Sequence, residues 1–244
     1  MSDSPAQDLG AHGGVTPGQY YGHGLPYAPI GDYPGRIIAI EGTDGVGRST
    51  QIRLLREWLE VRGYGVIETG WTRSPLMAPT IELAKSSNTL NKLTFVLLYA
   101  CDFADRLEKE IIPALKAGFI VLADRYIYTL MARDMVRGMD EAWLKNIYGI
   151  ALEPDAVFYL NVSPEELVQR SFAKNTALDY WESGMDLGLS RDMFDSFLKY
   201  QTAMQMTFRH MQSTYGFNIV DGMRSADAIN TELRKRIGDV LAGE

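Results

Sequence analysis

Cysteine is nearly missing from this sequence, because Cys101 is the single example among 244 residues. One cysteine excludes a disulfide bond within the chain and is typical of proteins that work in a reducing compartment. The residue stands in an apolar stretch with helical spacing, so we expect it to occupy a core position. The near absence of cysteine therefore favours a cytoplasmic location.

Long apolar runs and a secretion signal are missing as well. No apolar run reaches the roughly 20 residues of a membrane-spanning helix, and the N-terminus lacks the basic and apolar segments of a signal peptide. A formal net charge of -7 argues against a surface that binds nucleic acid. We expect neither a membrane nor a nucleic acid as partner, while a local loop can still bind a small anion.

Lysine and arginine are absent from residues 1–34. Half of the ten prolines lie in this segment, together with many glycines. Such a composition buries too little apolar surface to offset the entropy cost of ordering the chain. We expect a disordered tail over residues 1–34, dispensable for catalysis, and one folded domain over residues 35–244. The alternative is that the tyrosines of this segment dock on the domain or on a partner; these are Tyr20, Tyr21, Tyr27 and Tyr33.

The rest of the chain alternates short apolar runs with longer stretches of helical spacing. Helices are expected between the runs, including a long one over residues 91–117 and another over residues 191–215. This alternation is typical of an α/β fold with a parallel sheet and helices on both faces. Ligands of such sheets bind at the carboxyl ends of the strands. The apolar runs predict five strands, near residues 37–41, 64–69, 119–123, 155–162 and 217–220.

A glycine-rich turn separates the first strand from the following helix. Glycines allow a tight turn, and the helix N-terminus adds partial positive charge for binding a phosphate. The spacing is that of the P-loop, G-x-x-x-x-G-K-[ST], except that Arg48 stands at the lysine position. Arginine keeps the charge but is a broad planar fork. The alternative is a turn that binds nothing. We predict that ATP phosphates contact Gly42, Asp44, Gly45, Val46, Gly47, Arg48, Ser49 and Thr50.

An acidic residue, Asp124, follows the third predicted strand. In P-loop proteins this position holds Mg²⁺, together with the hydroxyl that Ser49 supplies here. Arg125 is placed next to it to clamp a phosphate. The alternative is an Asp-Arg pair that caps a helix. The sequence therefore predicts a magnesium and phosphate site at this edge of the sheet.

One face of the long helix carries two aromatic and two charged residues. Their spacing of i, i+3, i+4 and i+7 puts them on the same side. They either grip a planar ligand or form a surface ion pair beside ordinary core aromatics. The four residues are Tyr99, Asp102, Phe103 and Arg106.

Three ordered motifs resemble those of the thymidylate kinase family, and the resemblance covers about residues 36–242. The family's Glu-Gly-x-Asp-Gly-x-Gly-Lys-[Ser/Thr]-Thr-Gln is similar to residues 41–51, its Thr-Arg-Glu-Pro to residues 72–75, and its Asp-Arg-[Tyr/His] to residues 124–126. The resemblance implies a P-loop kinase fold, which is a three-layer sandwich around a five-stranded parallel sheet.

Roles for individual residues follow from this resemblance alone. It implies that Asp44 lies between the donor and acceptor phosphates and that Arg73 and Arg125 contact the acceptor phosphate. It implies that Tyr99 stacks on the base, with Phe103 and Arg106 beside it. A mobile lid is implied over about residues 173–189. Arg170 and Lys174 would give that lid positive charge toward ATP, and Asp179 and Glu182 keep the spacing of the acidic pair of the lid. The catalytic residues would be Asp44, Arg48 and Arg125.

Departures from the family pattern cluster in the site. Arg48 replaces the lysine, and Ser74 replaces the glutamate of Thr-Arg-Glu-Pro. Phe103 stands where a helix arginine is expected, one turn before Arg106. The remaining differences are Leu130 and Arg133, near the base and sugar, and Tyr180 in the lid.

The resemblance implies an enzyme that uses ATP and Mg²⁺ to phosphorylate a nucleoside monophosphate, with dTMP converted to dTDP. It also implies a homodimer. Two alternatives stay open because of the departures. One is a kinase for another small nucleotide acceptor, and the other is a nucleotide-binding pseudokinase with a regulatory role.

Overall fold

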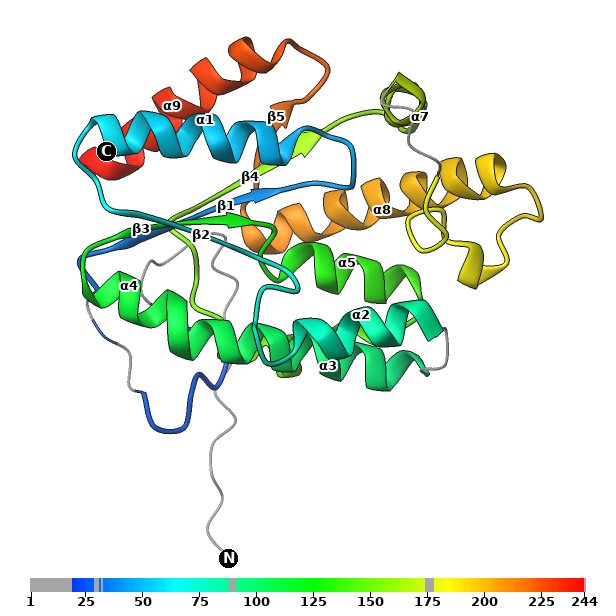
Figure 1. Cartoon of the computed structure of the whole chain (residues 1–244), viewed down its shortest axis with the longest axis horizontal. Helices are drawn as coiled ribbons and strands as arrows, with labels where there is room; N and C mark the ends of the chain where they lie inside the picture. The colour runs from blue at the N-terminus through cyan, green and yellow to red at the C-terminus, as the bar shows by residue number, and fades with distance from the viewer. Residues whose placement is uncertain (1–18, 29–30, 32, 88–90, 174–177, 244) are drawn as a thin grey trace, which may run out of the picture.

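The computed structural model describes residues 19–28, 31, 33–87, 91–173 and 178–243. Within this part of the chain, one sheet of parallel strands forms the centre of the molecule (Figure 1). Its spatial order is β2-β3-β1-β4-β5. This confirms the predicted five-stranded α/β fold. The strands are β1 (Arg36–Glu41), β2 (Val66–Gly70), β3 (Ile120–Asp124), β4 (Ala156–Asn161) and β5 (Asn218–Asp221).

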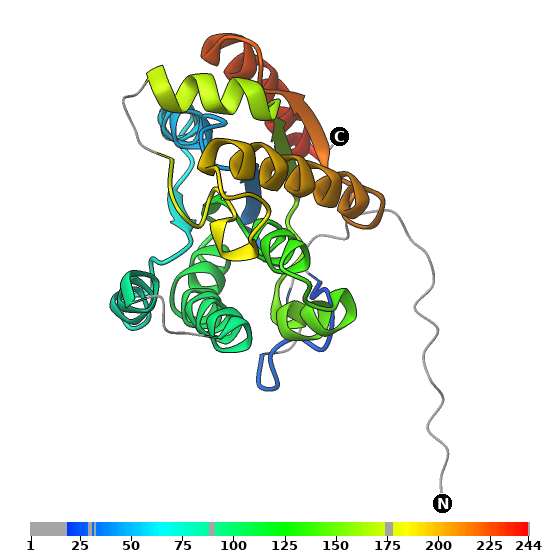
Figure 2. The ribbon, with the colours of Figure 1, turned by 90° about the vertical axis from the view of Figure 1, so that its right-hand side faces the viewer.

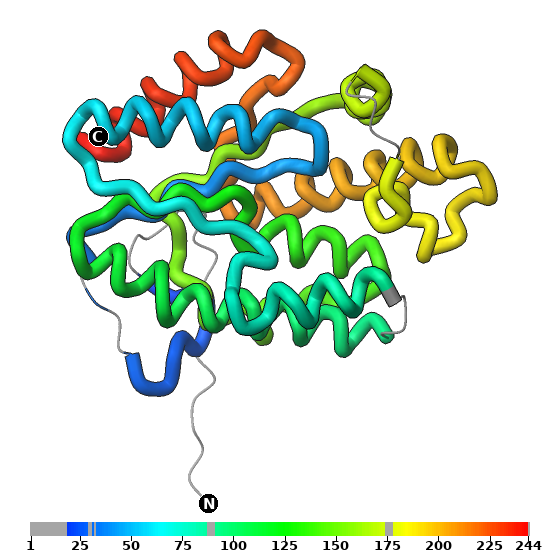
Figure 3. Tube along the Cα trace, viewed as in Figure 1, coloured from blue at the N-terminus to red at the C-terminus, as the bar shows by residue number. Residues whose placement is uncertain are grey.

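Helices cover both faces of the sheet, which gives the expected three layers (Figures 1 and 3). One face carries α1 (Arg48–Val61), α7 (Pro164–Ala173) and α9 (Ala226–Ala242). Short 3₁₀ turns follow α6 and precede α8, at η2 (Tyr148–Ile150) and η3 (Met185–Leu187). The other face carries α2 (Ala78–Ser87), α3 (Lys92–Arg106), α4 (Ile112–Lys116), α5 (Tyr128–Val136), α6 (Glu141–Ile147) and α8 (Met193–Tyr215).

Alternate side chains of the central strand build two separate cores. Ile37 and Ala39 pack with the helices of the α3, α5 and α8 face. Ile38 and Ile40 pack with α1 and α9. Successive strand residues point to opposite faces, so a strand that is apolar at every position must be covered on both sides. The unbroken apolar run of β1 is therefore the reason why it is a central strand.

The strand register brings three chain segments to the same edge. Ile40 of β1 lies beside Asp124 of β3, and Asp124 lies beside Gly70 of β2. Parallel strands end at the same edge, so the loops that follow these three strands are neighbours. This edge faces the viewer in Figure 2, where residues 178–189 lie in front of it between α8 and α5.

The long helix expected over residues 91–117 is interrupted. The π-helical turn η1 (Leu107–Ile111) separates α3 from α4. Pro113 has no N–H to donate to the preceding turn and its ring crowds that turn, and a π turn accommodates both effects. Cys101 on α3 is exposed, so the prediction of a core position for it is wrong. No helix of the described residues combines the length and the apolar character needed to cross a bilayer.

Residues 19–28 pack against the domain on the face of the sheet that carries α3, α4 and α5 (Figure 3). The N–H of Tyr21 donates to the carbonyl of Ala151 at 2.9 Å, and the N–H of Glu153 donates to the carbonyl of Gln19 at 2.7 Å. The ring of Tyr33 belongs to the core. For these residues the expectation of disorder is wrong. The alternative that tyrosines dock on the domain holds for Tyr20, Tyr21 and Tyr33, whereas Tyr27 is exposed. Residues 1–18 lie outside the described part of the chain.

Candidate active site

The glycine-rich turn after β1 has a backbone that side chains would obstruct. Gly42 has a φ of 140°, and a Cβ added to it would lie 2.9 Å from the carbonyl oxygen of Leu160. Gly47, with a φ of 101°, is the residue before α1, and no side chain caps this helix. The first N–H groups of α1 therefore remain available for an anion at the helix N-terminus.

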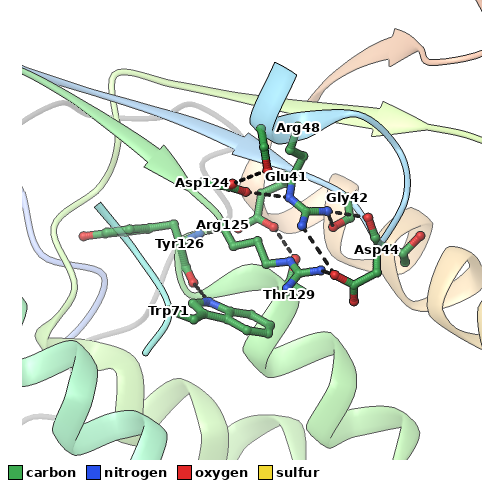
Figure 4. A network of polar contacts seen from close by, with 11 residues as sticks. Glu41, Gly42, Asp44, Arg48, Trp71, Asp124, Arg125, Tyr126 and Thr129 are labelled. Atoms are coloured by element: carbon green, nitrogen blue, oxygen red, sulfur yellow. Dashed lines mark hydrogen bonds and ion pairs between the residues drawn. The ribbon is translucent and has the colours of Figure 1, made fainter. Parts of the chain in front are cut away.

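Arg48 lies inside this turn (Figure 4). Its Nε donates to Oδ1 of Asp124 at 2.7 Å, and its Nη1 donates to the carbonyl oxygens of Gly42, at 2.5 Å, and Thr43. The residue is buried. The guanidinium thus holds the turn closed from within and offsets the charge of the carboxylate at the end of β3.

The two residues expected to hold Mg²⁺ are adjacent. The hydroxyl of Ser49 donates to Oδ2 of Asp124 at 3.1 Å. A hydroxyl and a carboxylate are hard oxygen donors, which Mg²⁺ takes in small numbers and combines with water and phosphate oxygens. The donor set therefore fits the ion on the Oδ2 side of Asp124, because Oδ1 is bonded to Arg48. No group of three or more His, Cys, Asp or Glu side chains gathers elsewhere in the described residues.

Arg125 joins the end of β3 to the P-loop. Its Nη2 donates to Oδ1 of Asp44, and its guanidinium lies 4.6 Å from the centre of the Trp71 ring (Figure 4). Although burial opposes ionisation of Asp44, the guanidinium groups of Arg125 and Arg48 hold the pKa of that carboxyl below its usual range. Arg125 has a φ of 69°, and its buried Nε has no hydrogen-bond partner in the described structure. A buried donor without a partner costs free energy, so Nε of Arg125 is available to donate a hydrogen bond to a ligand.

Glu41 anchors the segment that carries Arg125. It is fully buried and accepts hydrogen bonds from the N–H of Tyr126, at 2.7 Å, and from the hydroxyl of Thr129. Burial raises the pKa of the Glu41 carboxyl. The carboxyl at the end of β1 therefore fixes the turn between β3 and α5, and with it the backbone of Arg125.

The loop after β2 is positioned by α3. The N–H groups of Thr72 and Ser74 donate to the two carboxylate oxygens of Asp102, at 3.2 and 3.0 Å. Arg106 pairs with the same carboxylate at 3.0 Å and is buried, as is Asp102. The Asp102–Arg106 pair is therefore not on the surface. It holds the loop that presents Arg73.

An open cleft of about 240 Å³ lies beside the P-loop. It continues into a narrower recess with aromatic walls, formed in part by Tyr99 and Trp181. Phe103 and Arg106 are buried and line neither the cleft nor the recess, so their expected contact with the acceptor stays a prediction. The expected site residues that line the cleft are Arg48, Arg73, Tyr99, Asp124 and Arg125.

Residues 178–189, the described part of the segment expected to form a lid, lie along one side of the cleft. Asp179 and Glu182 line it, and Trp181 stacks on Phe95 at 5.6 Å between ring centres. Burial raises the pKa of the Glu182 carboxyl to about 7, with a further contribution from the charge of Asp44. Arg137, the residue that follows α5, holds this segment through an ion pair of 2.9 Å with Asp186.

Two basic residues, Arg170 and Lys174, are expected near ATP, and the structure describes only the first. Arg170 lies against the P-loop, where it donates to the carbonyl of Val46 at 3.2 Å and to that of Gly222 at 2.8 Å. It therefore ties the P-loop to the turn after β5. Lys174 lies outside the described residues.

Several residues of the site were not predicted from the sequence. Glu41 begins the first recognised motif and Trp71 precedes the second, but a buried carboxyl and a half-buried aromatic have no distinctive spacing. Repeating charged residues on α5 were a usable signal, because helical spacing places them on one face with Leu130. The residues without a predicted role are Glu41, Trp71, Lys85, Asp134, Arg137 and Trp181.

Comparisons with known proteins agree with this geometry. The model of a family described as "Thymidylate kinase" matches residues 40–233. The chain is 37% identical over 208 residues to "Probable thymidylate kinase 2" of Saccharolobus solfataricus, covering 85% of this chain and 97% of the relative. It is 31% identical over 216 residues to "Thymidylate kinase" of Caldanaerobacter subterraneus subsp. tengcongensis, covering 86% and 98%. It is 29% identical over 220 residues to "Probable thymidylate kinase" of Thermococcus kodakarensis, covering 85% and 100%.

Proposed function

The chain belongs to the thymidylate kinase family, and on that premise we propose that it transfers the γ-phosphoryl group of ATP to the 5′-phosphate of dTMP. One observation carries the proposal. Arg125, at the acceptor end of the cleft, is bonded to Asp44 of the P-loop, at the donor end. Two phosphates, one bound at each end of the cleft, would therefore meet at the Arg125–Asp44 pair.

The reaction needs positioning and charge neutralisation. An oxygen of the acceptor phosphate attacks the γ-phosphorus, the bond to the β-γ bridging oxygen breaks, and ADP leaves. Arg125 and Arg73 bind the acceptor phosphate, because both guanidinium groups line the cleft and Arg125 has an unused donor. Asp44 positions Arg125 through their ion pair. Bidentate arginines suit this role because their planar forks match phosphate oxygens.

Arg48 takes the place of the P-loop lysine in the proposal. Its guanidinium exchanges the carbonyl oxygens of Gly42 and Thr43 for phosphate oxygens of ATP, while its Nε stays on Asp124. Positive charge at this position is what a transferring phosphoryl group requires.

The proposal includes Mg²⁺, held by Ser49 and Asp124. When bound, the ion neutralises charge on the phosphates of ATP. Support comes from the adjacent hydroxyl and carboxylate oxygens described above. A cytoplasmic location, expected from the sequence, belongs to the same proposal.

A second copy of the chain is proposed to pack on α2 and α3. Leu93 and Leu97 are exposed one helical turn apart on α3, and Leu83 is exposed on the neighbouring α2. Exposed apolar side chains on adjoining helices suit a hydrophobic interface.

The test is release of ADP in a coupled assay with a panel of acceptors. Turnover with dTMP that exceeds turnover with dCMP, dUMP, dGMP and AMP supports the proposal. If turnover is fastest with another acceptor, that acceptor and not dTMP is the substrate. Binding of ATP without turnover on any acceptor would indicate a pseudokinase and would reject the proposal.

A further inference from the structure

One face of α5 forms a wall of the aromatic recess. Leu130, Arg133, Asp134 and Arg137 follow each other at i, i+3, i+4 and i+7, so they share this face. The opposite wall comes from Phe95 and Tyr99 of α3, and Trp181 of the lid closes the recess. Three charged side chains thus enter a space whose other walls are mainly apolar.

Arg137 has a structural role within the protein. Its Nε and Nη2 donate to the two carboxylate oxygens of Asp186 at 2.9 and 3.1 Å, and its Nη1 donates to the hydroxyl of Tyr200 at 2.7 Å. Its Nη2 also donates to the carbonyl of Trp181 at 3.1 Å. The guanidinium of Arg137 is therefore fully occupied in holding the lid.

Arg133 and Asp134 have no comparable role. Within the described residues, no hydrogen bond or ion pair is formed by either side chain. The guanidinium of Arg133 lies 5.6 Å from the centre of the Trp71 ring, on the cleft side of α5. Burial raises the pKa of the Asp134 carboxyl to about 7, because the charged form has little to bind there. Both residues are half-buried, and polar groups that are partly withdrawn from water without a hydrogen-bond partner cost free energy. A ligand that places a hydrogen-bond acceptor beside a hydrogen-bond donor would offset this free-energy cost.

We propose that Arg133 and Asp134 read the edge of the acceptor's base as a pair, with Arg133 donating to a ring carbonyl and Asp134 accepting the ring N–H beside it. This inference rests on the proposed function, since it concerns the acceptor of the same cleft. The phosphate is held at the other end by Arg73 and Arg125, and the aromatic walls contact the faces of the base. The class of base that matches is a pyrimidine-2,4-dione, thymine or uracil, which places a carbonyl next to N3–H.

Cytosine fails at both positions. Its amino group at C4 directs N–H toward the donor Arg133, and its N3 directs a lone pair toward the carboxylate of Asp134. Sites built to hydrogen-bond a polar edge reject a mismatched edge far more strongly than apolar pockets reject a size difference. The pair therefore selects diones over cytosine but does not distinguish thymine from uracil.

The experiment compares binding and turnover of dTMP, dUMP and dCMP in the full chain and in Asp134→Asn. An amide offers a donor to N3 of cytosine and loses the full acceptor for N3–H. We expect the preference for dTMP over dCMP, in Kd and in kcat/KM, to fall by about a hundredfold, with the KM of ATP unchanged. Asp239→Asn removes an exposed carboxylate of α9 and serves as the matched control. It should leave the preference intact.

A second variant, Arg133→Met, keeps the hydrophobic stem and removes the donors. It should also reduce the preference for dTMP over dCMP, and it provides the test if Asp134→Asn does not fold. Wild-type preference in a folded variant of either residue would overturn the inference while leaving dTMP phosphorylation in place. Failure of the unchanged protein to use dTMP would instead overturn the proposed function.

Discussion

Arg48 shows how one residue changes the inside of a P-loop. A lysine ammonium is compact, whereas this guanidinium bridges the carboxylate of Asp124 and two carbonyls of the turn. Because it is planar and broad, it stabilises the turn and neutralises Asp124 at the same time. In the proposed function, the guanidinium of Arg48 therefore both stabilises the loop and contacts the phosphates of ATP.

Substitution of Arg48 separates these two tasks. Arg48→Ala should reduce kcat by about 10²-fold or more, the scale of losing one preorganised electrostatic group. Arg48→Lys should retain or increase turnover, because lysine fits the cradle. Steady-state ADP release measures both. Arg53→Ala, which removes an exposed guanidinium of α1 paired with Glu57, is the control and should have no effect. Full activity of Arg48→Ala would show that the cation plays no part in transfer.

The carboxyl of Asp134 predicts a pH dependence of stability. Its pKa is raised by burial to about 7, while Arg137 and Arg133 oppose the rise. Tyr148, from the turn after α6, also lies near it. A raised pKa means that the folded state holds a proton that the unfolded state releases, so this group lowers stability as pH rises from about 4 to about 7.

Asp134→Asn should therefore be more stable than the unchanged protein above pH 7, by about 2 kcal/mol after allowance for solvent in the cleft. The difference should shrink as pH falls and vanish only below about pH 3, where the carboxyl is protonated in both the folded and the unfolded state. Urea unfolding at pH 4.5 and pH 8 measures it. A difference that is the same at both pH values would mean that the carboxyl is not held in its neutral form.

At the scale of elements, the segment over residues 19–28 behaves as part of the domain. Tyr21 packs edge-to-face against Tyr215 and Tyr128, with ring centres 5.3 and 6.1 Å apart. Its hydroxyl is hydrogen-bonded to that of Tyr128. These contacts attach the segment to α5 and to the end of α8.

Tyr21→Ala should lower the free energy of unfolding by about 3 kcal/mol, since it removes a large, partly buried ring and its hydrogen bond. In a domain of this size the melting temperature should fall by about 5–10 °C. Tyr27→Ala is the matched control, because Tyr27 is 68% exposed, and should shift it by less than about 2 °C. Equal shifts for the two variants would argue that the segment does not contribute to stability.

The elements show which parts of the fold and site were predictable. The order of strands and helices, the P-loop and the turn at Asp124 depend on local signals, namely apolar runs, glycines and strand ends. The docking of residues 19–28 depends on distant partners near Ala151, and composition cannot report them. Arg106 has the spacing of a surface pair, yet Thr69 and Asp102 surround it in the core. Periodicity identifies the shared face of a helix but not what that face meets.

At the scale of the whole molecule, the face formed by α2 and α3 predicts self-association. Leu83 is 69% exposed, Leu93 50% and Leu97 41%. Leu93 and Leu97 form an exposed stripe with Cys101, because all three are spaced by four residues. Apolar side chains in such an arrangement gain free energy when a second copy covers them.

Sedimentation velocity should find a dimer for the unchanged chain and mainly monomer for Leu97→Glu. A charge buried in an apolar interface should weaken the dimer by about a hundredfold or more. Met206→Glu places the same charge at another apolar side chain that is 65% exposed on α8, and it should remain dimeric. A monomeric unchanged chain would contradict the proposed pairing.

The attachment of residues 19–28 near Ala151 also has a consequence for synthesis on the ribosome. Tyr21 is made long before Ala151, so its partner is absent for roughly ten seconds at ordinary elongation rates. If the segment had the sequence of an apolar β-strand, it could pair with a wrong strand during that interval. The glycines and prolines of the segment disfavour such pairing. The glycine and proline content of residues 19–28 thus limits wrong strand pairing until their partners near Ala151 have been translated.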